Sequence, residues 1–162
     1  MKFEHNNISP LDNRYASKIV DTRACFSEAE LIKKRFIIEI DWLVYLCDKY
    51  PNYFLKISNV TKKKLNVLKN QFSDKDILKI KKIEKVTNHD VKAVEYFIRD
   101  IFLKDNTLKK YIHLIHFGLT SEDVNSLAYA IIIKNGIKIQ LRQINSLKKK
   151  LTLYSKKWNK DN

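Results

Sequence analysis

Residues that interrupt a helix are rare in this chain. Only two glycines and two prolines occur among its 162 residues, well below their usual shares of about 7% and 5%. A β-sandwich or barrel needs many turns, and such turns depend on glycine and proline. The sequence therefore predicts an all-α protein with long helices. An apolar content of 44% is sufficient for a core, and the length suits one domain or a piece of a larger one.

The longest uninterrupted stretch runs from Ser121 to about Trp158 and contains no proline and a single glycine. Within it, Ile137, Ile144, Leu151 and Trp158 recur at intervals of seven residues, which places them along one face of a helix. A helix of this length cannot bury such a stripe by itself. We therefore expect the first long helix of a helical bundle that is incomplete within this sequence.

Shorter helices are predicted upstream from capping residues and apolar spacing. Ser27 and Glu30 have the spacing of a capping box, and the helix that follows should end at Tyr50-Pro51. Four further helices are expected to start at Thr61, at Ser73 with Asp76, at Asp90, and at Thr107, the last running to Gly118. The predicted organisation is a small helical domain over residues 1–109 and the start of the bundle over residues 110–162.

The cysteines and the apolar pattern exclude several classes of protein. Cys25 and Cys47 lie 22 residues apart and have no spacing typical of a zinc site, so they are expected to be reduced, mostly buried thiols. The first ten residues lack the apolar segment of a signal peptide, and no apolar run is long enough to span a bilayer. We expect a soluble, cytoplasmic protein without a metal site.

The formal net charge of +14 raises the possibility of nucleic-acid binding. Lysine outnumbers arginine by 27 to 5, however, and the lysines are spread over every segment. Recognition of bases and phosphates favours arginine, whose planar group makes paired hydrogen bonds. A global lysine excess indicates compositional drift with solvated lysine side chains. The alternative is an inactive relic acting as a basic helical module that binds nucleic acid or another partner.

Polar motifs at helix or turn starts carry the functional signal. Each motif can be explained as a turn or a helix cap, yet helix N-termini also favour anions. The residues with donors for a carboxylate or phosphate are Arg14 and Tyr15 in SPLDNRY, Asn88, His89 and Asp90 in TNHD, and Thr120 and Ser121 in LTSED. If the helices bundle, these starts would form one pocket.

Three motifs also carry a resemblance to a known family. SPLDNRY, TNHDVKAVEYF and HFGLTSEDVNSLA, in that order and spacing, resemble the amino-terminal part of the adenylosuccinate lyase family, within the fumarase/aspartase superfamily. The resemblance covers about residues 8–145, and FSEAELIKKRFIIEIDWL is similar to that family's first long helix. TNHDVKAVEYF argues against another superfamily member, such as an argininosuccinate lyase.

The resemblance implies a β-elimination that releases fumarate from adenylosuccinate, giving AMP, and from the succinylo-carboxamide ribonucleotide of the purine pathway. Its implied partners are a nucleotide substrate and further copies in a homotetramer, with no metal or organic cofactor and no membrane or nucleic acid. By motif match, Arg14 and Tyr15 would hold the nucleotide phosphate, Asn88, His89 and Asp90 would contact the substrate, and Thr120 and Ser121 would bind a carboxylate of the succinyl arm.

The same resemblance places the proton-transfer residues elsewhere. The general acid is a histidine in a Thr-His-Gly loop after the first long bundle helix, and the base is a serine on a mobile loop farther along. Neither falls within residues 1–162. We therefore expect a substrate-binding portion with no catalytic residue of its own, inactive in isolation.

Overall fold

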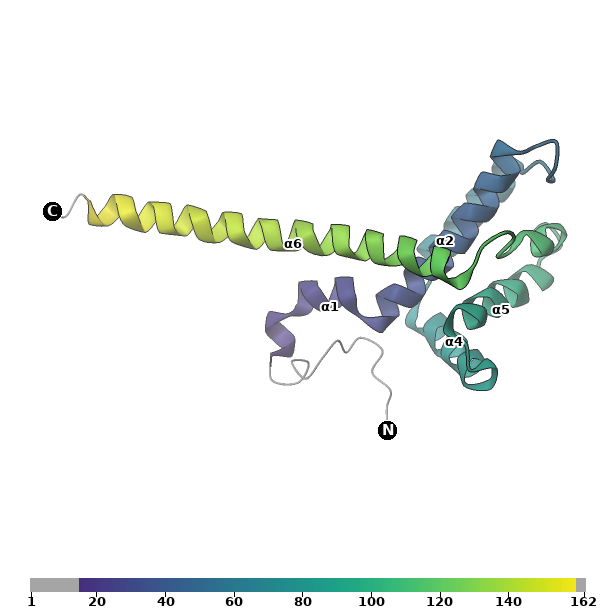
Figure 1. The fold of residues 1–162 in the computed structure, drawn as a ribbon, viewed down its shortest axis with the longest axis horizontal. Helices are drawn as coiled ribbons and strands as arrows, with labels where there is room; N and C mark the ends of the chain where they lie inside the picture. Colours follow the sequence, from purple (N-terminus) through teal and green to yellow (C-terminus); the bar gives the residue numbers. More distant parts are fainter. Residues whose placement is uncertain (1–14, 160–162) are drawn as a thin grey trace.

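A computed structural model describes residues 15–159 of the chain. Every regular element within that range is helical, which confirms the predicted all-α class (Figure 1). The α-helices are α1 (Val20–Phe26), α2 (Glu28–Lys49), α3 (Asn59–Asn70), α4 (Asp74–Thr87), α5 (Asp90–Leu103) and α6 (Ser121–Trp158). Two short 3-10 helices, η2 (Ala16–Lys18) and η3 (Lys109–Leu114), precede α1 and follow α5.

Helix α2 lies at the centre of the main core. Its buried face packs against α3, α4, α5 and α6, and Phe36 is the aromatic centre, with its ring centroid 4.7 Å from Phe72 and 5.9 Å from Phe97. The α4–α5 hairpin covers one side through Ile80 and Phe102, both fully buried. Burial of these large apolar side chains is the main source of stability in this part of the molecule.

A second, smaller cluster joins three helices near the starts of α5 and α6. It contains Ile38 of α2, Val91 of α5, and Val124 and Ala128 of α6. Because Val91 and Val124 lie in the first turn of their helices, this cluster fixes where both N-termini lie relative to α2. The TNHD and LTSED motifs therefore both lie next to this one apolar cluster.

Helix α6 runs from Ser121 to Trp158, as the sequence predicted. Its first half packs on α2 and α1, and its second half extends beyond all other described helices (Figure 1). Gly136 is the last buried residue on this helix, and every side chain over residues 140–159 is exposed. Among residues 15–159, no helix combines the length and apolarity needed to cross a membrane.

Several predicted helix starts are confirmed. Ser73 with Asp76 and Thr120 with Asp123 form complete capping boxes, in which side chain and backbone satisfy each other's hydrogen bonds. Ser27 caps α2 by accepting a hydrogen bond from the Glu30 backbone N–H at 3.3 Å. Local sequence was sufficient here because each cap forms within four residues.

Three predicted starts were wrong. Ser58, not Thr61, caps α3, since the Ser58 hydroxyl accepts from the Thr61 backbone N–H at 3.1 Å. His89, not Asp90, is the N-cap of α5. The His89 ring Nδ1 accepts the capping hydrogen bond from the Lys92 backbone N–H, a role that was expected for the Asp90 carboxylate. Thr107 caps no α-helix, and the segment that follows is the 3-10 helix η3.

Helix α1 was not predicted. Residues 20–26 carry no side-chain cap, and a helix of seven residues is unstable without packing. Its partner is α6: the Cys25 thiol donates to the Ile132 carbonyl at 3.2 Å, and the Phe26 ring lies against the bare Cα of Gly136. Both cysteines are free and buried, as expected. The division of the chain at residues 109 and 110 stays a prediction.

Candidate functional site

The TNHD motif forms the junction between α4 and α5. Asn88 adopts a left-handed conformation with φ 50° and ends α4, and His89 then begins the cap of α5. The Nδ1 atom of His89 accepts a hydrogen bond from the Lys92 backbone N–H at 3.2 Å. In a neutral imidazole this places the ring proton on Nε2. The ring is about half exposed, so its Nε2–H is a donor available for a ligand.

Asp90 is tied to the scaffold by two contacts. Its Oδ1 accepts from the Val91 backbone N–H at 2.8 Å, and its Oδ2 lies 2.7 Å from the Arg35 guanidinium. Partial burial would raise the pKa of Asp90, but the Val91 bond and the Arg35 charge outweigh burial and leave this pKa below its ordinary value. Asp90 is therefore an ionised side chain whose two oxygens are already engaged.

Arg35 connects α2 to both neighbouring helix starts. The residue is 5% exposed, and besides Asp90 it binds Asn125 of α6, with Nε donating to Oδ1 at 2.9 Å. Asn125 lies one turn after Ser121. Arg35 thus links the TNHD and LTSED motifs through a buried cation, which a guanidinium with several fixed donors can do and an ammonium cannot do as well.

In the LTSED motif, the Thr120 hydroxyl is used within the cap. It donates to the Asp123 carboxylate at 2.9 Å and accepts from the Asp123 backbone N–H at 3.4 Å. The Thr120 backbone N–H bonds the same carboxylate at 2.7 Å and is the main cause of the lowered pKa of Asp123. Ser121, half-buried beside this cap, is the better candidate to donate a hydroxyl to a ligand at this helix start.

The loop before Thr120 is held in place by Glu39 of α2. This carboxylate is 1% exposed and accepts from the His116 backbone N–H at 3.0 Å, with the His116 Nδ1 at 2.6 Å from its other oxygen. Burial raises the pKa of Glu39, although the bonds to His116 oppose that effect. His116 and Gly118 both adopt left-handed conformations, with φ 61° and 68°. The Glu39–His116 interaction therefore stabilises a turn in which His116 has a left-handed backbone conformation, which only glycine adopts without strain.

Trp42 completes the support of this loop, its Nε1 donating to the Phe117 carbonyl at 2.8 Å. Arg35, Glu39 and Trp42 are spaced i, i+4 and i+7, and so share one face of α2. None of the three belongs to a motif predicted from the sequence. The signal that was present is two charged residues one helical turn apart, Arg35 and Glu39, in the apolar-rich part of α2, which indicates contacts to other segments.

The structure brings together only part of the predicted site. His89, Asp90, Thr120 and Ser121 all lie at helix starts packed on α2. Tyr15 is exposed and precedes α1, whose end of the molecule lies apart from the α4–α5 hairpin in Figure 1. The predicted phosphate ligand Arg14 lies outside the described residues. The roles of all these residues stay predictions.

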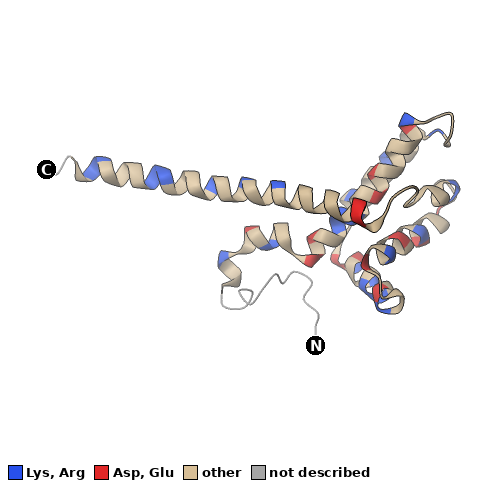
Figure 2. Cartoon of the chain, in the orientation of Figure 1, with Lys and Arg blue, Asp and Glu red and all other residues tan. Residues whose placement is uncertain are grey.

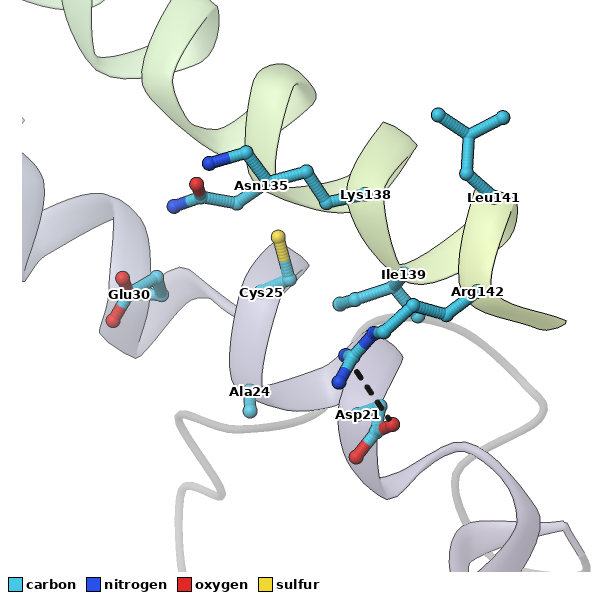
Figure 3. A pocket seen from close by; sticks show the side chains of 9 residues that line it. All are labelled: Asp21, Ala24, Cys25, Glu30, Asn135, Lys138, Ile139, Leu141 and Arg142. Atoms are coloured by element: carbon cyan, nitrogen blue, oxygen red, sulfur yellow. Dashed lines mark ion pairs between the residues drawn. The ribbon is translucent and has the colours of Figure 1, made fainter. Parts of the chain in front are cut away.

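Two cavities lie along α6, and only the second adjoins a candidate motif. The first, of about 650 Å³, lies between α1 and α6 (Figure 3) and contains the Asp21 carboxylate, 3.9 Å from Arg142. Burial raises the pKa of its Cys25 thiol, which is therefore not an activated nucleophile. The second, of about 730 Å³, lies between α2 and α6, is lined by Trp42 and Asp123, and so adjoins the LTSED motif. Within residues 15–159 no group of three or more side chains could hold a metal ion.

Comparisons with known proteins identify the family. A family model described as lyase matches residues 32–160, from the second turn of α2 to the end of α6. The chain belongs to this lyase family. Three relatives named adenylosuccinate lyase come from Legionella pneumophila strain Corby, 43% identical over 134 residues, Buchnera aphidicola subsp. Acyrthosiphon pisum, 36% identical over 155, and Escherichia coli K12, 37% identical over 132.

The matches cover most of this lyase-family chain but only part of each relative. They include 82%, 91% and 78% of the chain, and 29%, 34% and 28% of the respective relative. The chain thus spans about 30% of the length of the curated relatives that it matches. Residues 32–160 include α5, α6 and all of α2 from Ile32 onward, so the TNHD and LTSED motifs and the α2 residues that support them belong to the matched part.

Proposed function

We propose that this lyase-family chain supplies the amino-terminal, substrate-binding part of an adenylosuccinate lyase. The reaction would be the β-elimination of fumarate from adenylosuccinate, giving AMP, and from the succinylo-carboxamide ribonucleotide. The observation that carries the proposal is the linkage of TNHD and LTSED through Arg35, in a segment 43% identical to a relative named adenylosuccinate lyase. Both motifs present helix N-termini, which suit an anionic substrate.

The contacts of each residue suggest how the roles would divide. His89, with Nδ1 occupied by the Lys92 N–H, would donate from Nε2 to the substrate. Asp90, engaged by Arg35, would position His89 and the helix start, not bind substrate itself. Ser121 and the first N–H groups of α6 would bind a carboxylate of the succinyl arm, because Thr120 already donates its hydroxyl to Asp123.

Elimination also needs a base beside the carboxylate and an acid for the leaving amine. We propose that both groups come from segments outside residues 1–162, as the resemblance implies. The nucleotide phosphate would be held by Arg14 and Tyr15, and the active assembly would be a cytoplasmic homotetramer that uses no metal or organic cofactor. By itself the 162-residue chain would bind parts of the substrate without turning it over.

A chimaeric enzyme tests the proposal. Residues 15–145 would replace the matching segment of the E. coli relative, to which the chain is 37% identical, and fumarate release would be followed by ultraviolet absorbance. We expect turnover by the chimaera and none by the chain alone. A folded, assembled chimaera without turnover, or turnover by the isolated chain, would contradict the proposed division of roles.

Variants of the chimaera separate binding from chemistry. His89→Ala should lower kcat by roughly 10²- to 10⁴-fold, the usual effect of a positioned polar group near the reacting atoms. With residue 14 included in the exchanged segment, Arg14→Ala should mainly raise KM, because the phosphate is distant from the breaking C–N bond. Lys85→Ala, an exposed change on the same hairpin, is the matched control. Equal kinetics for His89→Ala and this control would remove His89 from the site.

A further inference from the structure

The cavity between α2 and α6 differs in charge from the rest of the molecule. The formal net charge of the chain is +14, yet among residues 15–159 the charged side chains that line this cavity of about 730 Å³ are Asp41 and Asp123 alone. The red segment at the start of α6 in Figure 2 marks the turn that contains Asp123. Every other described lining residue is aromatic, aliphatic or glycine. The cavity, whose volume is that of a small-molecule site, is therefore acidic and largely apolar on a basic protein.

Three aromatic rings line the same cavity. Trp42 and Tyr45 are stacked, with ring centroids 5.4 Å apart and planes at 20°, and the Tyr50 ring stands at 79° to Tyr45 with centroids 6.4 Å apart. The bond from Trp42 to the Phe117 carbonyl holds the indole in place, whereas Tyr45 and Tyr50 are 46% and 44% exposed. The face of an aromatic ring carries partial negative charge and attracts cations. The rings and the carboxylates therefore favour a ligand of the same charge.

Each carboxylate of the cavity uses only one of its oxygens. Asp41 Oδ1 lies 2.5 Å from the Lys69 ammonium, and the Thr120 backbone N–H and hydroxyl both donate to Oδ2 of Asp123. Within residues 15–159 neither Oδ2 of Asp41 nor Oδ1 of Asp123 makes a hydrogen bond. The Thr120 bonds also lower the pKa of Asp123, so this carboxyl is ionised at neutral pH. Both carboxylates can therefore pair with a further positive charge, as a cation entering an apolar cavity requires.

The lining of the cavity restricts the class of ligand. A metal ion needs several converging oxygen ligands, and the aromatic rings supply none. The anionic substrate proposed above would be repelled by both carboxylates, and a neutral apolar molecule would gain nothing from them. We propose that this cavity binds a small organic cation, whose alkylated ammonium group lies against the rings and carboxylates and whose apolar body covers the aliphatic lining. The proposal does not depend on the proposed lyase activity, since the two ligands carry opposite charges.

Three matched small molecules test the proposal with the whole chain. They are the cation 3-hydroxyphenyltrimethylammonium, its neutral isostere 3-tert-butylphenol, and the anion 3-hydroxybenzoate. Titrations are followed by proton NMR, in which the cation and its isostere each give one sharp methyl signal that broadens and moves upfield against ring faces. We expect the dissociation constant of the cation to be lower than that of the isostere by about fivefold or more, and no saturable binding of the anion. The net charge of +14 would favour the anion, so it cannot produce this order.

Two variants of lining residues have matched controls on the same part of the chain. Asp41→Asn and Tyr45→Leu should each weaken binding of the cation by about threefold or more, and Asp41→Asn should leave binding of the neutral isostere unchanged. Asp48→Asn is the control for the charge, because Asp48 pairs with Lys62 at 2.6 Å but does not line the cavity. Tyr53→Leu is the control for the ring, since Tyr53 is exposed and also outside the lining. Circular dichroism verifies that every variant remains helical.

Removal of Lys69 tests the proposal in the opposite direction. Its ammonium competes for Asp41, so Lys69→Met should tighten binding of the cation by about twofold or more. Lys62→Met, the same change beside Asp48, should not. Equal affinities of the unmodified chain for the cation and its isostere would overturn the proposal, as would tighter binding of the anion or the same loss in the Asp41 and Asp48 variants. Absence of cation binding by the helical chain would also overturn it.

Discussion

Arg35 is expected to be the most important polar residue for the packing of α2 against α5 and α6. We consider Arg35→Met, which retains most of the apolar stem and removes the charge. The side chain is 6% exposed, whereas its partner Asp90 is 48% exposed. The ion pair should therefore contribute only about 1 kcal/mol, the upper range for pairs in contact with water. The bond to Asn125 has a charged donor and should contribute about 1.5 kcal/mol.

Removing the guanidinium also relieves the cost of dehydrating it. The loss should therefore be slightly smaller than the sum of the ion pair and the Asn125 bond. We expect Arg35→Met to lower the free energy of unfolding by about 2 kcal/mol. For a chain of this size that corresponds to a thermal midpoint lower by about 4–8 °C. The assay is urea and thermal denaturation followed by far-ultraviolet circular dichroism. Lys33→Met, which removes the same charge from a half-buried neighbour on α2, should change stability by less than half as much.

The difference between wild type and Arg35→Met should depend on pH. The pKa of Asp90 is lowered in the folded chain, so the stability that its ionisation contributes is fully present above the unfolded pKa of about 3.9. It is lost as the pH falls through the lower, folded pKa. We therefore expect a constant difference at neutral pH that shrinks below about pH 4. A variant as stable as wild type at neutral pH would refute the role assigned to Arg35.

Three further predictions concern other parts of the fold. Gly136→Ala should destabilise the chain by about 1 kcal/mol, because the new Cβ meets the Phe26 ring; Phe26→Ala in the same chain should remove most of that loss, and additive effects would contradict the packing. Cys25 and Cys47, whose pKa values are raised by burial, should react with iodoacetamide far more slowly in native buffer than in urea, as mass spectrometry would show. Ser73→Ala should cost about 1 kcal/mol by removing the α4 cap, and an unchanged thermal midpoint would count against the capping box.

The helices that could be predicted are those whose signals are local. The capping boxes of Thr120 with Asp123 and of Ser73 with Asp76 depend on residues three apart, and both formed. Thr61 failed as a cap because Ser58 offers the same hydroxyl chemistry three residues earlier, in the extended conformation that a cap requires. Sequence alone does not distinguish two hydroxyl residues three positions apart that can both cap.

The parts that could not be predicted depend on distant contacts. Helix α1 is stabilised by packing on α6, with the bond between Cys25 and Ile132 spanning 107 residues of sequence. Arg35 and Glu39 hold the two candidate motifs, yet nothing near them in the sequence reveals that their partners are Asp90, Asn125 and His116. The motifs were recognisable from residue types, whereas the scaffold that orients them required the tertiary structure.

The uneven packing of α6 divides one continuous helix into two populations of backbone amides. Up to Gly136 the helix is packed on α2 and α1, so amide hydrogens there exchange with solvent only when neighbouring helices separate. Over residues 140–159 all side chains are exposed, and exchange requires only that the helix unwind from its carboxyl end. A ligand covering the second half would turn fast-exchanging amides into slow ones without lengthening the helix by a single residue.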